Sequence, residues 1–210
     1  MLDETTTREP LSLTTPEGAP IGGRASGDHW PTPLWATAFF LRIAFARRWL
    51  ENGDRVLDPC CGEGAIIRSC AAFCLRPRGI ELDPDRARDA ERLRWVVTTG
   101  DALALGWSHE PVVITNPPYG KAALFVEKAL AERPARGLVA MLLPLTFCER
   151  KAHKAILREH PADVYPLPRR PQFDSRGSPR VPHAWWLWQG RPAGEPTRIF
   201  LAEDEEKPCQ

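Results

Sequence analysis

Residues 116–119, Asn-Pro-Pro-Tyr, follow the apolar run PVVIT (111–115) and precede a segment with helical character. Proline donates no ladder hydrogen bond and holds φ at about −65°, so a strand must end here with its carbonyls in fixed directions. The side-chain oxygen of Asn116 and the carbonyl of Pro117 can then accept hydrogen bonds from an amino group. After Pro118, the ring of Tyr119 offers a surface on which a planar group can stack.

This set of groups suits chemistry on a planar amine. The lone pair of an amine conjugated to an aromatic ring is delocalised, so the nitrogen is a poor nucleophile. Two acceptors aimed at its hydrogens would favour the tetrahedral nitrogen that forms during attack. A simple Pro-Pro turn beside a chance tyrosine is the alternative, and it explains Pro117 and Pro118 but not their neighbours.

Three further short motifs follow apolar runs upstream. DPCCGEG (58–64) follows RVL, and its glycines Gly62 and Gly64 allow a tight turn and a close backbone approach to a ligand. GIELD places Glu81 about 20 residues further on, the position of an acid that binds ribose hydroxyls in dinucleotide-binding folds. GDAL places Asp101 after the next apolar run. Each acid alone is more often a helix cap or a solvated turn residue. Three acids at the ends of successive expected strands indicate a shared binding site instead.

The segments around these motifs alternate between two kinds. We expect strands at 55–58, 78–82, 95–99, 111–115 and 137–143, and helices at 64–74, 84–93, 121–132 and 148–158. HAWWLWQ (183–189) predicts a further strand, with antiparallel insertion as one option, in which Trp186 and Trp188 face one side and Trp185 the other. The fold class is therefore α/β, a doubly wound and mostly parallel sheet covered on both faces, with ligands at the carboxyl ends of its strands.

Composition predicts one domain. The chain has 210 residues and is 43% hydrophobic, enough for one sizeable core. We expect a flexible arm at 1–27, a catalytic domain at 28–202 and an acidic tail at 203–210. No apolar stretch approaches the roughly 20 residues that span a bilayer, and the start lacks a secretory signal, so a cytoplasmic protein with no membrane partner is expected.

Cysteine spacing matches no disulfide framework or zinc-ribbon pattern, so we expect reduced thiols and no metal. The alternative is a metal held by cysteines that include Cys70 and Cys74, which would share a helix face and join Cys60 and Cys61.

Taken in order, DPCCGEG, GIELD, GDAL and NPPY resemble the motifs of class I S-adenosylmethionine-dependent methyltransferases, and specifically of small, phage-type DNA adenine methyltransferases. The likeness covers roughly residues 28–189. It implies a seven-stranded sheet and direct methyl transfer to the exocyclic amino group of adenine in DNA after base flipping. It also implies catalytic roles for Asn116, Pro117, Pro118 and Tyr119, and a cofactor site formed by Trp30, Thr32, Pro33, Asp58, Pro59, Cys60, Gly62, Gly64, Glu81, Leu82, Asp101, Ala102 and Asn116.

The segment 150–180 is locally basic, which fits either a solvated face or a nucleic-acid footprint. By resemblance, Phe173 supports the second face of a flipped base, and Arg169 and Arg170 beside it contact DNA together with Tyr119. A core phenylalanine is the alternative for Phe173.

Other functions remain open. RNA adenine methyltransferases and release-factor glutamine methyltransferases carry the same NPPY chemistry. The release-factor enzymes normally have a helical substrate domain ahead of the glycine loop. In this chain only about 55 residues precede Asp58, where that loop begins. A binding module that has kept the fold without catalysis is the third option. The expected partner is duplex DNA with a flipped adenine, RNA is the alternative, and the oligomeric state is not predicted.

Overall fold

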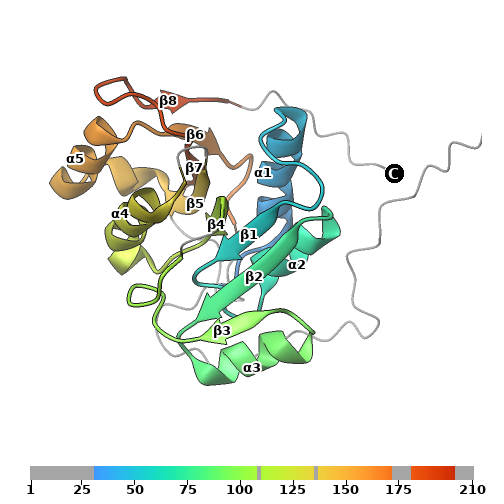
Figure 1. Cartoon of the computed structure of the whole chain (residues 1–210). Helices are drawn as coiled ribbons and strands as arrows, with labels where there is room; N and C mark the ends of the chain where they lie inside the picture. The colour runs from blue at the N-terminus through green and yellow to red at the C-terminus, as the bar shows by residue number, and fades with distance from the viewer. Residues whose placement is uncertain (1–30, 108–109, 135–136, 172–180, 202–210) are drawn as a thin grey trace, which may run out of the picture.

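One mixed sheet organises the chain (Figure 1). The structure is a computed structural model that describes residues 31–107, 110–134, 137–171 and 181–201. Its eight strands lie in the order β3-β2-β1-β4-β5-β7-β6-β8. The strands are β1 (Arg55–Asp58), β2 (Arg76–Glu81), β3 (Val97–Thr99), β4 (Val112–Thr115), β5 (Leu138–Pro144), β6 (Asp163–Pro166), β7 (His183–Trp188) and β8 (Arg198–Ile199).

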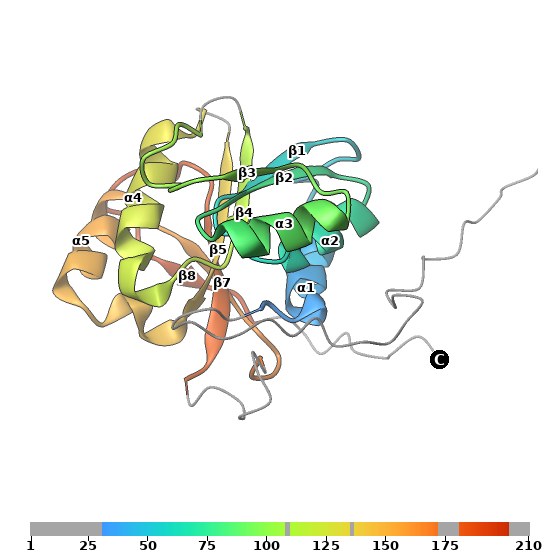
Figure 2. The same cartoon turned by 90° about the horizontal axis from the view of Figure 1, so that it is seen from below.

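Helices cover both faces of the sheet. They are α1 (Leu34–Ala46), α2 (Ala65–Ala72), α3 (Pro84–Arg92), α4 (Ala122–Glu132) and α5 (Lys151–Glu159), with short 3₁₀ turns η1 (Tyr119–Lys121) and η2 (Leu145–Cys148). Figures 1 and 2 show α4 and α5 on one face and α1 and α2 on the other. The predicted doubly wound α/β class is therefore confirmed.

Local sequence explains individual boundaries. At the start of α3, Asp83 accepts hydrogen bonds from the backbone N–H groups of Asp85 and Arg86, and Pro84 fills the first helical position, where its missing N–H costs nothing. All four residues of β4 are buried, as expected for a parallel strand covered on both faces.

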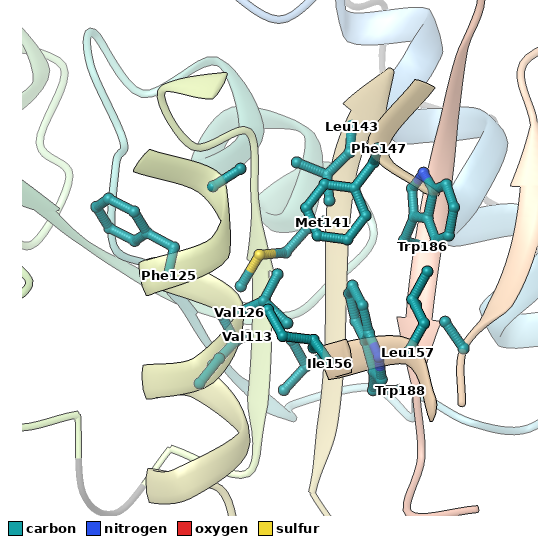
Figure 3. Close-up of a cluster of buried hydrophobic side chains, with 14 of the residues drawn as sticks. Val113, Phe125, Val126, Met141, Leu143, Phe147, Ile156, Leu157, Trp186 and Trp188 are labelled. Carbon is teal, nitrogen blue, oxygen red and sulfur yellow. The ribbon is translucent and has the colours of Figure 1, made fainter. Parts of the chain in front are cut away.

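The strand β7 lies between β5 and β6 and is antiparallel to both. This confirms the expected late strand and its orientation. Its tryptophans alternate as predicted. Trp186 and Trp188 pack into the core beneath α4 and α5 (Figure 3), whereas Trp185 packs on the other face among α1 and α2.

Some boundaries and elements were not foreseen. The sheet has eight strands rather than seven because the two-residue β8 extends it beside β6. The four-residue β6 (DVYP) has only two central residues that are buried, and β8 has only two residues. The helix α1 was not predicted either, and it has apolar residues around most of its circumference. Cys74 does not share a helix face with Cys70, because α2 ends at Ala72 and Cys74 is an exposed turn residue with φ of 59°.

Within the described ranges, no helix combines the length and the apolar character needed to cross a membrane. The expected arm (1–27) and the expected tail (203–210) both lie outside the described residues.

Candidate active site

The strand β4 ends at Thr115, directly before Asn116. The amide nitrogen Nδ2 of Asn116 donates a hydrogen bond to Oγ1 of Thr32, at 3.0 Å. This contact joins segments 84 residues apart and brings two sequence-predicted site residues together. It also fixes which end of the Asn116 amide faces Thr32, so that the carbonyl oxygen is the end turned away from it.

The two prolines have different carbonyl environments. The carbonyl of Pro118 accepts the backbone N–H of Lys121 at 2.9 Å and so closes η1. Within the described part of the chain, the carbonyl of Pro117 has no backbone donor. Pro117, and not Pro118, is therefore the proline of this motif whose main-chain oxygen has no backbone donor within the described residues.

Asp58 lies buried at the end of β1, beside the end of β4. Its Oδ1 atom accepts hydrogen bonds from Oγ1 of Thr115 at 2.7 Å and from the backbone N–H of Cys60 at 3.2 Å. Its Oδ2 atom is buried and has no hydrogen-bond partner among the described residues. Burial raises the pKa of Asp58 to about 7, against the lowering effect of the two hydrogen bonds.

The glycine loop is tied to the next strand tip by Glu81. Oε2 of Glu81 accepts the backbone N–H of Gly62 at 2.8 Å, and Oε1 accepts the N–H of Asp83 at 2.9 Å. Gly64 has φ of 88°, and a Cβ atom added there would lie 2.8 Å from the ring of Trp95, so this position requires glycine. Glu81 thus contacts the glycine loop directly, an interaction that the sequence spacing alone does not specify.

The other predicted cofactor residues line the same edge. Leu82 follows the buried Glu81 and is 63% exposed, which leaves an apolar side chain in solvent at the carboxyl end of β2. Asp101 is exposed and its Oδ1 accepts the N–H of Leu103 at 2.9 Å. Ala102 is buried, as is Pro59 beside the half-buried Cys60, and Pro33 is the N-cap residue directly before α1.

Tyr119 packs against a residue that the sequence did not single out. The rings of Tyr119 and His183 have centroids 5.4 Å apart at an interplanar angle of 41°. His183 is buried at the start of β7, and its Nδ1 lies 2.9 Å from the carbonyl of Val181. Burial lowers the pKa of His183 to about 4, so the imidazole is neutral and Nδ1–H is the donor.

Of the expected DNA-contacting residues, Tyr119, Arg169 and Arg170 are described. Arg169 is exposed, and its guanidinium lies 4.5 Å from the ring centroid of Trp35 in α1, next to the Thr32–Pro33 segment. Arg170 is exposed. Phe173 lies outside the described residues, as does Trp30. Sequence analysis missed Trp35 and His183 because single aromatic residues outside a motif carry no positional signal.

The cysteines near the site are poor nucleophiles. Burial raises the pKa of both Cys60 and Cys61, and the carboxylate of Asp58 raises both further. Across the described ranges, no three or more His, Cys, Asp or Glu side chains are grouped so as to hold a metal ion.

Comparison with known proteins identifies the fold. Neither a protein-family model nor a curated protein matches the sequence. Among solved structures, a putative class I S-adenosylmethionine-dependent methyltransferase from Listeria monocytogenes matches with a TM-score of 0.66 at 15% identity, over 85% of this chain and 67% of the other. The chain therefore has the class I methyltransferase fold.

Two further structures with this fold are a restriction-enzyme subunit and an RNA methyltransferase. The M protein of the type I restriction enzyme EcoKI matches with a TM-score of 0.54 at 16% identity, over 73% of this chain and 46% of its own. An RNA methyltransferase from Salinibacter ruber, solved in complex with S-adenosyl-L-homocysteine, matches with a TM-score of 0.51 at 17% identity, over 84% and 99%.

Proposed function

We propose that this protein is a methyltransferase that moves a methyl group from S-adenosylmethionine to the exocyclic amino group of adenine in DNA. The observation that carries the proposal is the end of β4, where Asn116 is held by Thr32 and followed by a carbonyl, that of Pro117, with no backbone donor in the described chain. A planar amine placed there meets two acceptors fixed by the strand.

The residues at the carboxyl edge fit S-adenosylmethionine. Its amino acid part carries an ammonium group, and its sulfur is positively charged. The buried Oδ2 of Asp58, without a partner among the described residues, is an acceptor of the right charge once Asp58 is ionised. A buried carboxylate that keeps an unused oxygen costs stability unless a cation or donor arrives, which favours a ligand at this position.

Glu81 and Leu82 fit the nucleoside part of the cofactor. Each oxygen of the Glu81 carboxylate already accepts one N–H, and each has a second lone pair for a ribose hydroxyl. Leu82 presents an exposed apolar surface next to it for an adenine ring. Asp101, at the next strand tip, has a second carboxylate oxygen that can accept from the adenine amine.

When bound, S-adenosylmethionine supplies an activated methyl group. The chain itself holds the nucleophile. The amide oxygen of Asn116 and the carbonyl of Pro117 accept the two hydrogens of the target amine, which draws the nitrogen away from planarity and exposes its lone pair. Because these acceptors are fixed before the base arrives, little reorganisation is needed during attack.

Tyr119 supports the face of the target base. An adenine in a duplex is out of reach, so it must leave the stack and be held by new contacts. The ring of Tyr119 packs against the neutral ring of His183, which limits its rotation. Arg169 and Arg170 lie on the loop after β6 and are available to the flanking phosphates.

The decisive experiment is an assay with labelled S-adenosylmethionine on duplex DNA, single-stranded DNA, RNA and a release factor in parallel. Labelled N6-methyladenine in digested DNA supports the proposal. Label in RNA or in a protein glutamine instead would replace it with the alternative that uses the same four residues. Asn116→Ala is the control, because it should bind S-adenosyl-L-homocysteine yet transfer label at least ~10²-fold more slowly than wild type.

A further inference from the structure

The outer face of α5 carries a row of cations. Arg150, which precedes the helix, Lys154 and Arg158 are four residues apart, and Lys151 lies beside them. Residues at this spacing share one side of a helix. All four are exposed, whereas the opposite side buries His153 together with Ile156 and Leu157, the last two in the core shown in Figure 3. We refer to Arg150, Lys151, Lys154 and Arg158 as the α5 stripe.

The α5 stripe is not neutralised by neighbouring acids. Across the described ranges, none of its four side chains forms an ion pair. The arginines of α3 are arranged differently, since Arg88 pairs with Asp85 and Arg92 with Asp89 three residues away. A solvated surface would be expected to look like α3, with both signs interspersed.

A groove runs beside the C-terminal half of the α5 stripe, where Lys154 and Arg158 lie. It is lined by Lys154, Leu157, Arg158 and residues 194–197, and the N–H of Gly194 donates to the carbonyl of Arg158 at 2.9 Å. The acid in this groove, Glu195, is already paired with Arg191 and Arg198, which lowers its pKa through the Arg191 hydrogen bonds first. The groove therefore keeps two unpaired cations and no unpaired acid.

The stripe is held in a fixed position relative to the candidate active site. β5 lies beside β4, and η2 leads from the end of β5 into α5, so the stripe starts at the edge that carries Asn116. In that corner, Phe147 stacks on His153 with ring centroids 4.1 Å apart, and Nδ1 of His153 lies 2.7 Å from the Phe147 carbonyl. Phe147 also meets the edge of Trp186 at 5.3 Å. These contacts fix where α5 begins.

We infer that the α5 stripe is a phosphate-contacting surface for the DNA that flanks the target base; this inference rests on the proposed function and adds the position of the duplex. Arg150 to Arg158 spans eight residues, or about 12 Å along the helix. With a rise of about 3.4 Å per base pair, that length matches three to four base pairs of backbone. The duplex then leaves the active-site edge along α5 toward the groove beside β8.

The test compares two double variants with the same change of charge. Lys154→Gln with Arg158→Gln removes two stripe cations, and Arg88→Gln with Arg92→Gln removes two paired arginines on α3. The dissociation constant for a fluorescent duplex is measured at several salt concentrations in the presence of S-adenosyl-L-homocysteine. The stripe variant should lower the slope of log affinity against log salt by about 1.8, since each phosphate contact contributes about 0.9. The α3 variant should keep the wild-type slope.

A wild-type slope in the stripe variant, with unchanged melting temperature and cofactor affinity, overturns the inference. An equal loss of slope in both variants also overturns it, because the effect would then come from net charge and not from the stripe. These results are distinguishable from failure of the proposed function, which would appear as wild-type protein that neither binds nor methylates duplex DNA.

Discussion

The ring of His183 lies against the ring of Tyr119, with centroids 5.4 Å apart, and so a residue from the inserted strand β7 supports the last residue of the NPPY motif after β4. Because the imidazole is buried and its pKa is lowered to about 4, it acts here as an uncharged ring at working pH.

We expect His183→Ala to loosen Tyr119 and raise the Michaelis constant for DNA by up to roughly tenfold, since an aromatic pair contributes about 0.5–1.5 kcal/mol. His183→Phe keeps a ring and should recover most of that loss. Steady-state kinetics on a short duplex, with the melting temperature measured in parallel, check this. If His183→Phe behaves like His183→Ala, then the imidazole nitrogens and not the ring matter.

Removal of the Asn116 side chain should act on turnover. Asn116→Ala is expected to slow methyl transfer by ~10²-fold or more, as for other preorganised groups that stabilise developing charge. Thr32→Val keeps the shape but loses the hydrogen bond that orients the amide, so a smaller loss of roughly threefold to tenfold is expected. Single-turnover rates at saturating cofactor measure both. Equal rates in Asn116→Ala and wild type would refute the role of Asn116 as an acceptor.

The raised pKa of Asp58 predicts a pH-dependent cofactor affinity. The ionised carboxylate is the form that attracts the ammonium group, so affinity should rise as pH increases from about 5 to 7 and then level off, by at most tenfold per pH unit. Asp58→Asn should bind more weakly and lose this dependence. Calorimetry with S-adenosyl-L-homocysteine across this range decides it, and a flat wild-type profile would contradict the assignment.

The same group sets an opposite trend in stability. The folded state binds the Asp58 proton more tightly than the unfolded chain, where the pKa is 3.8, so folding is favoured at low pH by this residue. Its contribution to the free energy of unfolding should fall as pH rises from about 4 to 7, by up to about 4 kcal/mol. Denaturant titrations of wild type and Asp58→Asn isolate the effect. A difference between the two that does not vary with pH would show that Asp58 titrates normally.

Glu81→Ala should weaken cofactor binding by roughly 1.5–3 kcal/mol, the range for hydrogen bonds to charged groups. Because Glu81 also accepts the N–H of Gly62, the same variant should lower the melting temperature of the free protein. Leu82→Ala, one residue away and 63% exposed, is the matched control for stability and should leave it near wild type. Wild-type affinity in Glu81→Ala would mean that Glu81 is only a structural residue of the loop.

Much of the sheet could be predicted because its central strands are short, mostly apolar and followed by motifs rich in glycine, proline or acids. β1 and β4 were located closely for this reason. The same motifs located the candidate site, since strand tips of a parallel sheet meet at one edge. Contacts between segments distant in the sequence could not be predicted. Nothing in the residue type of His183 or Trp35 indicates which motif residue it contacts. The strand β6 and the edge strand β8 were missed because a sheet neighbour, and not a local pattern, makes them strands.

The position of β7 between β5 and β6 affects the order in which the strands can pair during synthesis of the chain. Within the described residues, β6 pairs only with β7 and β8, and both follow it in the sequence. A nascent chain that has emerged only as far as residue 171 therefore has β6 without a hydrogen-bonded neighbour and β5 with one open edge. β7 fills that gap and brings Trp185, whose indole N–H donates to the Ala36 carbonyl at 2.8 Å, and His183 to Tyr119. The candidate site is thus completed only after β7 has been synthesised and has paired with both β5 and β6.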